Sequence, residues 1–360
     1  MDEIQREESM KRLTEYLTAA KDMGASDVHF APGAKPMFRV DGVLIPYGDT
    51  TLMSPDIDPF AYAILSDSQV RDLQETGELD TAFTIPGFGR MRVNVFRQRG
   101  TYALAIRILS FVIPTAQELG LPQSVIDLAD MKRGLVLVTG ATGSGKSTTL
   151  AALVDIINSK YSKHIITLED PIEYLHRHKK SMVTQRELGL DSLSYASALR
   201  AALRQDPDVI LLGEMRDLET ISTAITAAET GHLVFSTLHT NDASSTIDRI
   251  IDVFPPHQQQ QIRIQLATVL KGVVCQQLLP HSDGKGRVAA FEIMLGNYAI
   301  SNLIREGKTF QIPGVMQTSK KDGMIVMDDA LIELYKAGSI DRETALKYSH
   351  DNSLMERKLR

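Results

Sequence analysis

Apolar residues at helical spacing occupy the first part of the chain. Met10, Leu13, Leu17 and Ala20 recur at intervals of three or four positions, and Gly24 follows them. Side chains at this spacing lie on one face of an α-helix, and glycine commonly ends a helix. The pattern therefore predicts an amphipathic helix that stops near Gly24.

Alternation of apolar and polar residues replaces the helical spacing after this segment. Two short alternating runs flank Asp41 and Gly42, a pair that favours a two-residue hairpin turn. Farther along, the odd positions of residues 91–95 are apolar, which places Arg92 on the opposite face of a strand. Arg107 points out of the next predicted strand for the same reason. These patterns predict a small α+β domain with outward-facing arginines.

Continuous apolar runs separated by helical patterns distinguish the second part of the chain. The runs cover residues 135–138, 165–168, 209–212 and 233–235. Fully apolar strands that alternate with helices are typical of a parallel sheet covered on both faces. We therefore predict an α/β nucleotide-binding fold for this part.

The boundary between the two parts and the C-terminal region have patterns of their own. Residues 113–122 contain two prolines and a glycine, and neither the helical spacing nor the strand alternation continues through them. From about residue 256 a helical pattern prevails, and its apolar stripe is predicted to hold Ile262, Leu266, Val269, Leu270 and Val273. The expected division is an N-terminal domain over 1–112, a linker over 113–122 and an α/β domain over 123–360 with a helical C-terminal part.

Composition and charge exclude several classes of protein. The 360 residues are 43% hydrophobic and 23% charged, which excludes a disordered or collagen-like chain. The net charge of −6 argues against a nucleic-acid coat, and no nucleic-acid partner is expected. Cys275 is the single cysteine, so no disulfide can form within the chain and a reducing compartment is indicated. Because there is no signal-peptide pattern and no apolar run of about 18 residues, we expect a cytoplasmic protein with peripheral membrane contact at most.

A glycine-rich motif follows the first apolar run of the second part. Residues 140–147 fit the pattern GxxxxGK[ST], and a helical pattern continues from them. The backbone N–H groups of such a turn surround phosphates, the lysine reaches the β- and γ-phosphate oxygens, and the last hydroxyl can coordinate Mg²⁺. The expected nucleotide-binding residues are Gly140, Thr142, Gly143, Ser144, Gly145, Lys146, Ser147 and Thr148, with Ser147 as the Mg²⁺ ligand.

A carboxylate ends another of the apolar runs. Glu214 follows residues 209–212 and Gly213. Ligands of parallel α/β sheets bind beyond the carboxyl ends of the strands, where this carboxylate can orient and partly deprotonate an attacking water. Gly213 stands where many P-loop enzymes have an aspartate linked to Mg²⁺, so Ser147 and water are expected to hold the metal.

Other polar residues follow or flank strands of the same predicted sheet. Glu169 begins an acidic group after residues 165–168, and it either faces a metal-bound nucleotide or belongs to a solvated loop. His232 and His239 lie at opposite ends of the run 233–235, and each can hydrogen-bond a phosphate or a carboxylate. A histidine at a strand end is more often structural than functional, and only the position beside the P-loop favours His239.

Taken together, these segments resemble the secretion ATPases and, among them, the PilT/PilU-like motors of type IV pilus retraction. The similarity extends over nearly the whole chain. The matching segments are residues 140–147 (Walker A motif), 167–173 (Asp box), 213–217 (Walker B end) and 230–240 (His box).

The resemblance implies a RecA-like P-loop ATPase domain preceded by a smaller PAS-like α+β domain, assembled as a homohexamer that binds ATP and Mg²⁺. The active-site residues that it implies are Glu214 as the catalytic carboxylate, Glu169, His232 and His239 in support, and Arg92 and Arg107 as arginines that reach the phosphates of a neighbouring subunit. It also implies ATP hydrolysis that drives pilus retraction and twitching motility at the cytoplasmic face of the inner membrane. The implied partners are the inner-membrane platform protein of the pilus machine and a paralogous pilus ATPase.

One departure from the family pattern keeps alternatives open. The retraction enzymes carry the stretch Ala-Ile-Arg-Asn-Leu-Ile-Arg-Glu, and residues 299–306 match it except that Ser301 replaces the first arginine. An accessory or regulatory paralogue that binds nucleotide remains an alternative to a retraction motor. A DNA-translocating RecA-type ATPase is a further alternative, which would require a basic channel with aromatic residues.

Overall fold

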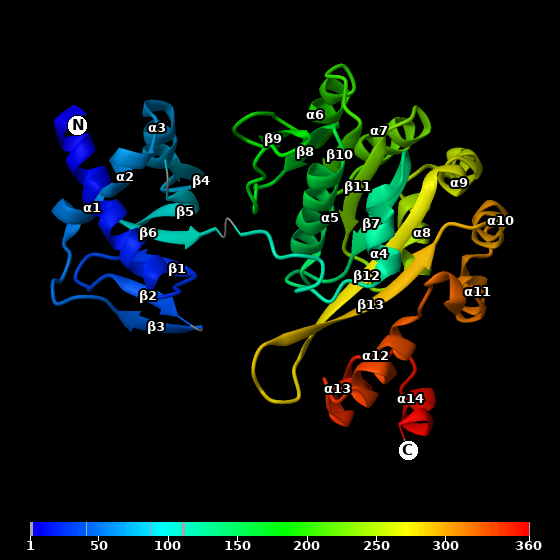
Figure 1. Ribbon diagram of the computed structural model, residues 1–360. Coiled ribbons are helices and arrows are strands. Elements are labelled where there is room, and N and C mark those ends of the chain that lie inside the picture. Colours follow the sequence, from blue (N-terminus) through cyan, green and yellow to red (C-terminus); the bar gives the residue numbers. More distant parts are fainter. Residues whose placement is uncertain (1–2, 41, 87, 110–111, 360) are drawn as a thin grey trace. The chain divides into compact units, whose positions relative to one another are not determined.

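The computed structural model describes residues 3–40, 42–86, 88–109 and 112–359 of the chain. Two compact units are present (Figure 1). The first comprises residues 1–112 together with 173–175, and the second comprises residues 113–172 and 176–360. Within the described residues, no helix has both the length and the apolar character that crossing a bilayer requires.

The first unit is built around a six-stranded antiparallel sheet with the strand order β3-β2-β1-β6-β5-β4. Its elements are α1 (Glu3–Asp22), β1 (Asp27–Phe30), β2 (Met37–Val40), β3 (Val43–Pro46), α2 (Ser54–Ile64), α3 (Asp67–Thr76), β4 (Glu78–Ile85), β5 (Gly89–Gln98) and β6 (Thr101–Ile108). The predicted first helix is confirmed, because α1 buries Leu13, Leu17 and Ala20.

The faces of this sheet follow the predicted alternation. Met91, Val93 and Val95 are fully buried in β5, whereas Arg92 and Arg107 are exposed. The hairpin turn was predicted at Asp41, which lies outside the described residues, although β2 and β3 do pair on either side of it.

The second unit contains a seven-stranded sheet with the strand order β13-β12-β7-β11-β10-β8-β9, in which only the pairing of β12 with β13 is antiparallel. Its first elements are α4 (Gln123–Ile126), η1 (Asp127–Asp130), β7 (Gly134–Thr139), α5 (Lys146–Lys160), β8 (His164–Glu169), β9 (Met182–Glu187), α6 (Tyr195–Ala202), β10 (Val209–Leu212), α7 (Leu218–Glu229) and β11 (Leu233–Leu238). The remaining elements are α8 (Ala243–Asp252), α9 (Pro256–Val269), β12 (Leu270–Pro280), β13 (Arg287–Leu295), α10 (Tyr298–Glu306), η2 (Thr309–Gln311), α11 (Ile312–Thr318), η3 (Lys320–Asp322), α12 (Met327–Lys336), α13 (Arg342–Lys347) and α14 (Asn352–Lys358). The four predicted parallel strands are therefore present, as β7, β8, β10 and β11.

Strands of this sheet send alternate side chains into two cores. In β7, Leu135 and Leu137 pack with helices α6 to α9, whereas Val136 and Val138 pack with α5 on the other face. Burial of both faces explains why the strand sequences are continuously apolar. A smaller core joins α12, α13 and α14 to the β12–β13 hairpin, and Figure 1 shows these three helices together at the C-terminal end of the chain.

The helical stripe predicted beyond residue 256 is wrong from Leu270 onward. Helix α9 ends at Val269, and the chain continues as strand β12, in which Leu270 and Val273 are buried. The short apolar run at this junction fits both a buried helix and a buried strand, and pairing with β7 and β13 decides for the strand. The C-terminal part thus adds two strands to the sheet before it becomes helical.

Candidate active site

The predicted site residues converge because four strands run parallel. Strands β7, β11, β10 and β8 are neighbours in that order, so their carboxyl ends lie along one edge of the sheet. Residues 140–147 follow β7, His239 follows β11, Glu214 follows β10 by two residues, and Glu169 ends β8. Three motifs that are far apart in sequence therefore lie along the same edge of the sheet as the glycine-rich loop, and His239 follows the strand next to β7.

The loop leads directly into helix α5. Gly145 is the N-cap residue, with a left-handed φ of 90°, and no side chain caps the first turn of α5. The start of a helix favours an anion, through its N–H groups and through the helix dipole. Lys146 is buried, and its Nζ donates hydrogen bonds to the carbonyl oxygens of Gly140 (2.8 Å) and Ala141 (3.0 Å).

The hydroxyl groups of the loop fit a phosphate and its metal ion. Ser144 is buried, and its Oγ has no hydrogen-bond partner in the part of the chain that the structure describes. Thr142 is exposed, while Ser147 and Thr148 are half-buried in the first turn of α5. No group of three or more His, Cys, Asp or Glu side chains among the described residues could hold a metal. Mg²⁺ commonly binds through one or two protein oxygens together with phosphates and waters, and Ser147 can supply such an oxygen.

Glu214 lies between two basic side chains. Its side chain is 14% exposed, and its two carboxylate oxygens lie 2.6 Å from Nε of Arg216 and 3.4 Å from Nε2 of His239. The preceding Gly213 is held by both neighbouring strands, since its N–H donates to the Leu168 carbonyl (2.8 Å) and its carbonyl accepts from Thr237 Oγ1 (2.5 Å). The carboxylate is therefore fixed at the edge of the sheet, beside the histidine that follows β11.

Glu169 lies at the end of β8 and is half-buried. One of its oxygens accepts hydrogen bonds from Thr167 Oγ1 (2.6 Å) and Gln185 Nε2 (3.2 Å). Gln185 belongs to β9, an edge strand that the sequence patterns did not predict. The carboxylate thus has an ordered position on the same edge as Glu214.

His232 is not brought to this edge within the chain. It precedes β11, whereas His239 follows the same strand, so the two rings lie at opposite edges of the sheet. The His232 Nδ1 lies 2.9 Å from the Ala227 carbonyl oxygen, a contact to the end of α7. A role for His232 in the active site stays a prediction.

Arg92 and Arg107 belong to the first unit and are direct cross-strand neighbours there. Arg107 Nε donates to Asp27 Oδ1 at 2.9 Å. Burial raises the pKa of Asp27, but hydrogen bonds from Ser26 and Arg107 outweigh that effect and lower it. Two cations side by side on an exposed face suit an anionic ligand, and their contact with phosphate stays a prediction.

A buried glutamine beneath the loop was missed from the sequence. Gln276 of β12 accepts a hydrogen bond from Thr149 Oγ1 of α5 at 2.7 Å, and both side chains are buried. A methyl group placed on Gly145 would lie 2.8 Å from the amide nitrogen of Gln276. Gln276 therefore supports the loop and the first turns of α5 from below. Gln276 belongs to none of the sequence motifs, and the segment that contains it was predicted to be mostly helical.

Comparisons with known proteins identify a family and several similar proteins. Residues 3–325 match the family described as type II/IV secretion system protein. Over 333 residues the chain is 47% identical to the type IV pilus retraction ATPase PilT of Pseudomonas aeruginosa, covering 92% of this chain and 96% of that protein. It is 42% identical over 328 residues to the type IV pilus ATPase PilU of the same organism, covering 91% and 86% of the two chains. A crystal structure of the pilus retraction motor PilT with bound ADP is similar with a TM-score of 0.90, at 51% identity over 95% of this chain and 98% of the other.

Proposed function

The chain belongs to the type II/IV secretion system protein family, and on that premise we propose that it is an ATPase motor that drives type IV pilus retraction and twitching motility. The observation that carries the proposal is the 47% identity, over 92% of the chain, to a type IV pilus retraction ATPase. The similarity of the fold to an ADP-bound retraction motor, at a TM-score of 0.90, supports the same activity. The fold is that of a RecA-like ATPase domain preceded by a smaller N-terminal domain.

The proposed reaction uses the groups at the sheet edge. The loop N–H groups and Lys146 bind the phosphates, and Ser147 is the protein ligand for Mg²⁺, which neutralises phosphate charge when bound. Glu214 orients the attacking water and accepts its proton, with His239 and Glu169 beside it. Thr142, Ser144 and Thr148 complete the phosphate-binding loop. His232 lies at the opposite edge of the sheet, and its supporting role stays a prediction from the family resemblance.

Coupling of hydrolysis to movement requires an assembly. In the proposed homohexamer, Arg92 and Arg107 of one subunit contact the phosphates held by a neighbour, and the loss of γ-phosphate changes those contacts. Residues 113–122, which contain no helix or strand, are the proposed linker between the domains. The proposed place of action is the cytoplasmic face of the inner membrane, where the motor binds the platform protein of the pilus machine and a paralogous pilus ATPase.

Purified protein tests the chemistry. Glu214→Gln should lower kcat by about 10²- to 10⁴-fold while ADP still binds, because the base is lost and the loop is intact. Lys146→Ala should weaken nucleotide binding itself. Phosphate release by Glu214→Gln at the rate of the parent protein would refute the assignment of the catalytic carboxylate.

Cells test the motor. Deletion of the gene should leave cells hyperpiliated and unable to twitch, and Lys146→Ala should reproduce that phenotype. Bald cells would instead indicate a role in pilus extension.

A second candidate, an accessory retraction motor, is favoured by the residue that departs from the family pattern. Ser301 Oγ donates a hydrogen bond to the Ala267 carbonyl of α9 at 2.8 Å, so this position of α10 is turned into a helix contact. The 42% identity to PilU is compatible with such a paralogue. Expression of this chain in cells that lack every other retraction ATPase distinguishes the candidates. Twitching restored by this chain alone supports the motor, and restoration only together with a paralogue supports the accessory role.

A further inference from the structure

The edge strand β9 directs two polar side chains toward the segment that follows β8. Gln185 and Glu187 are two residues apart, so their side chains project from the same face of β9. Strand β9 pairs in parallel with β8, which places Gln185 opposite Thr167 and Glu187 opposite Glu169. Both side chains form hydrogen bonds with the end of β8 or with residues that follow it, and these bonds define what β9 does at this edge.

The side-chain amide of Gln185 has one orientation because its two partners differ in kind. Its Oε1 accepts a hydrogen bond from the His176 N–H at 2.8 Å, and its Nε2 donates to Glu169 Oε1 at 3.2 Å. A backbone N–H can only donate and an ionised carboxylate can only accept. The amide oxygen must therefore face His176, and the NH₂ group must face the Glu169 carboxylate.

Glu187 holds the beginning of the same segment. The residue is buried, and its Oε2 accepts a hydrogen bond from the Ile172 N–H at 3.1 Å. Its own N–H donates to Asp191 Oδ2 at 2.8 Å, which fixes the end of β9 in turn. Together with the bond from His176, the chain that leaves β8 is thus tied to β9 at two points.

The Glu169 carboxylate is held from two strands. Thr167 Oγ1, two residues earlier in β8, donates to the same Oε1 at 2.6 Å that accepts from Gln185 of β9. Two donors that converge on one oxygen from different strands restrict rotation of the carboxylate. The contact from β9 cannot be found from the motif that contains Glu169, because it comes from a separate strand.

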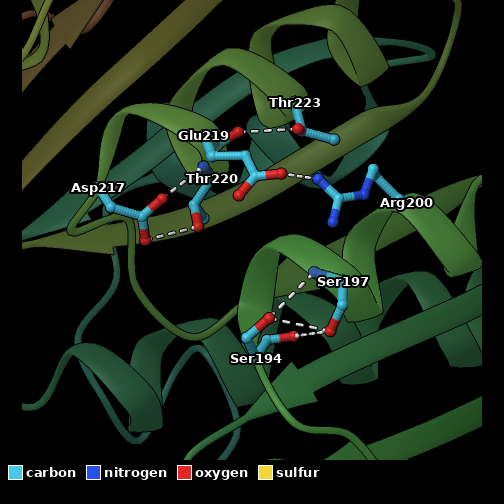
Figure 2. A network of polar contacts seen from close by, with 7 residues as sticks. All are labelled: Ser194, Ser197, Arg200, Asp217, Glu219, Thr220 and Thr223. Atoms are coloured by element: carbon cyan, nitrogen blue, oxygen red, sulfur yellow. Dashed lines mark hydrogen bonds and ion pairs between the residues drawn. The ribbon is translucent and has the colours of Figure 1, made fainter.

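Glu214 is supported by a different set of contacts. Asp217, three residues after it, is the N-cap of α7 and accepts hydrogen bonds from the Thr220 N–H and hydroxyl, both at 2.8 Å. Arg200 of α6 forms an ion pair with Glu219 in the first turn of α7, as Figure 2 shows. These side chains come from α6 and α7, so a substitution in β9 should leave the Glu214 side of the edge in place.

We propose that Gln185 is a positioning residue for ATP hydrolysis, whose amide group holds the Glu169 carboxylate in a fixed orientation at the edge of the sheet. The inference rests on the proposed ATPase function. It adds a residue that none of the four motifs contains, and it gives the edge strand β9 a part in the reaction. A carboxylate acts on developing charge through its orientation, so its displacement lowers kcat more than it weakens nucleotide binding.

Gln185→Glu tests the proposal because it keeps the acceptor for the His176 N–H and replaces the NH₂ donor by an oxygen that repels Glu169. The expected result is a kcat lower by at least about tenfold, with KM for ATP and the Kd for ADP changed less than twofold. Gln265→Glu is the matched control, since Gln265 Nε2 donates to Glu229 Oε2 at 2.9 Å between α9 and α7. It brings the same two charges together away from the site and should leave kcat unchanged. Unchanged kcat in Gln185→Glu, or equal losses in both variants, would overturn the proposal.

An exchange of the two side chains separates the positioning role from general damage. Gln185→Glu combined with Glu169→Gln reverses donor and acceptor, so the urea midpoint of unfolding, lowered by Gln185→Glu alone, should return to the parental value. The kcat should stay low, because the carboxylate is then on the wrong strand. A midpoint that does not recover would refute the contact, and a kcat that recovers would refute the positioning of a carboxylate. If the parent protein hydrolyses no ATP, the proposed function fails, whereas the unfolding measurements still report on the contact.

Discussion

Removal of the glutamine under the phosphate loop should weaken nucleotide binding without touching a phosphate-binding residue. Gln276→Leu keeps the approximate volume of the side chain but deletes the acceptor of the 2.7 Å hydrogen bond from Thr149 Oγ1. Both side chains are buried, so water cannot replace the lost partner. The substitution acts on helix α5 at its first turns, where Lys146 and Ser147 lie.

The magnitude follows from burial of an unpaired polar group. A buried hydroxyl or amide left without its partner costs about 1–3 kcal/mol, whereas replacing both partners by apolar groups of similar shape is nearly neutral. Thr149 can turn to the carbonyl four residues earlier, so Gln276→Leu should fall near the lower limit of that range. Thr149→Val leaves the buried Gln276 amide without its donor and should lower the free energy of unfolding by about 2 kcal/mol. The double variant should be more stable than the sum of the single costs predicts.

The assay is a double-mutant cycle measured by urea unfolding, together with the Kd for ADP. We expect a coupling of at least about 1 kcal/mol between the two positions and an ADP affinity about tenfold lower in Gln276→Leu. Thr268→Val is the matched control, since that exposed hydroxyl bonds only within α9. Single costs that add within about 0.5 kcal/mol, with parental ADP affinity, would refute the argument that Gln276 supports the loop.

Three further predictions concern single side chains elsewhere in the two units. Burial raises the pKa of the Cys275 thiol and hides it, so a thiol reagent should modify it only as fast as the protein unfolds; rapid modification of the native protein would contradict this. Burial opposes ionisation of Asp329, but hydrogen bonds from Lys320 and Lys358 outweigh burial and lower the pKa of Asp329. The ionised carboxylate therefore stabilises the fold at neutral pH, and this stabilisation is lost as the pH falls below about 4. Asp329→Asn should flatten the acid slope of the unfolding free energy against pH, and an unchanged slope would contradict this. Asp27→Asn breaks an ion pair whose Arg107 side chain is 63% exposed, so thermal unfolding should show a loss of at most about 1 kcal/mol, and a larger loss would mean that the pair is not solvent-screened.

Local patterns were enough to predict the parts of the site that belong to one segment. The glycine-rich loop and its lysine follow a strand and begin a helix, and the structure has that strand and that helix as β7 and α5. Glu214 and His239 could be placed near the loop because parallel strands share one carboxyl edge. The outward direction of Arg92 and Arg107 followed from the period of two in a strand. In each case, residues close together in the sequence were enough to predict the position of the side chain.

Contacts made by distant segments could not be predicted in this way. The apolar run in β12, residues 273–275, is too short to distinguish a strand from a buried helix, and pairing with β7 and β13 makes the segment a strand. Gln276 therefore had no predicted position, although it is a close neighbour of the loop. Strand β9 is short and mixed in character, and it pairs at the edge of the sheet, where its polar Gln185 holds Glu169.

Gly213 belongs to a local sequence motif and is also in contact with a distant segment. In sequence, a glycine stands where many P-loop enzymes have an aspartate linked to Mg²⁺, and this alone predicts only that the metal has one protein ligand fewer. In space the same position is filled from outside the motif by the Tyr195 hydroxyl. A side chain at 213 and a phenol at 195 exclude each other, so the two positions should be substituted together and not singly. A small residue within a catalytic motif is therefore a reason to look for the distant side chain that fills its place.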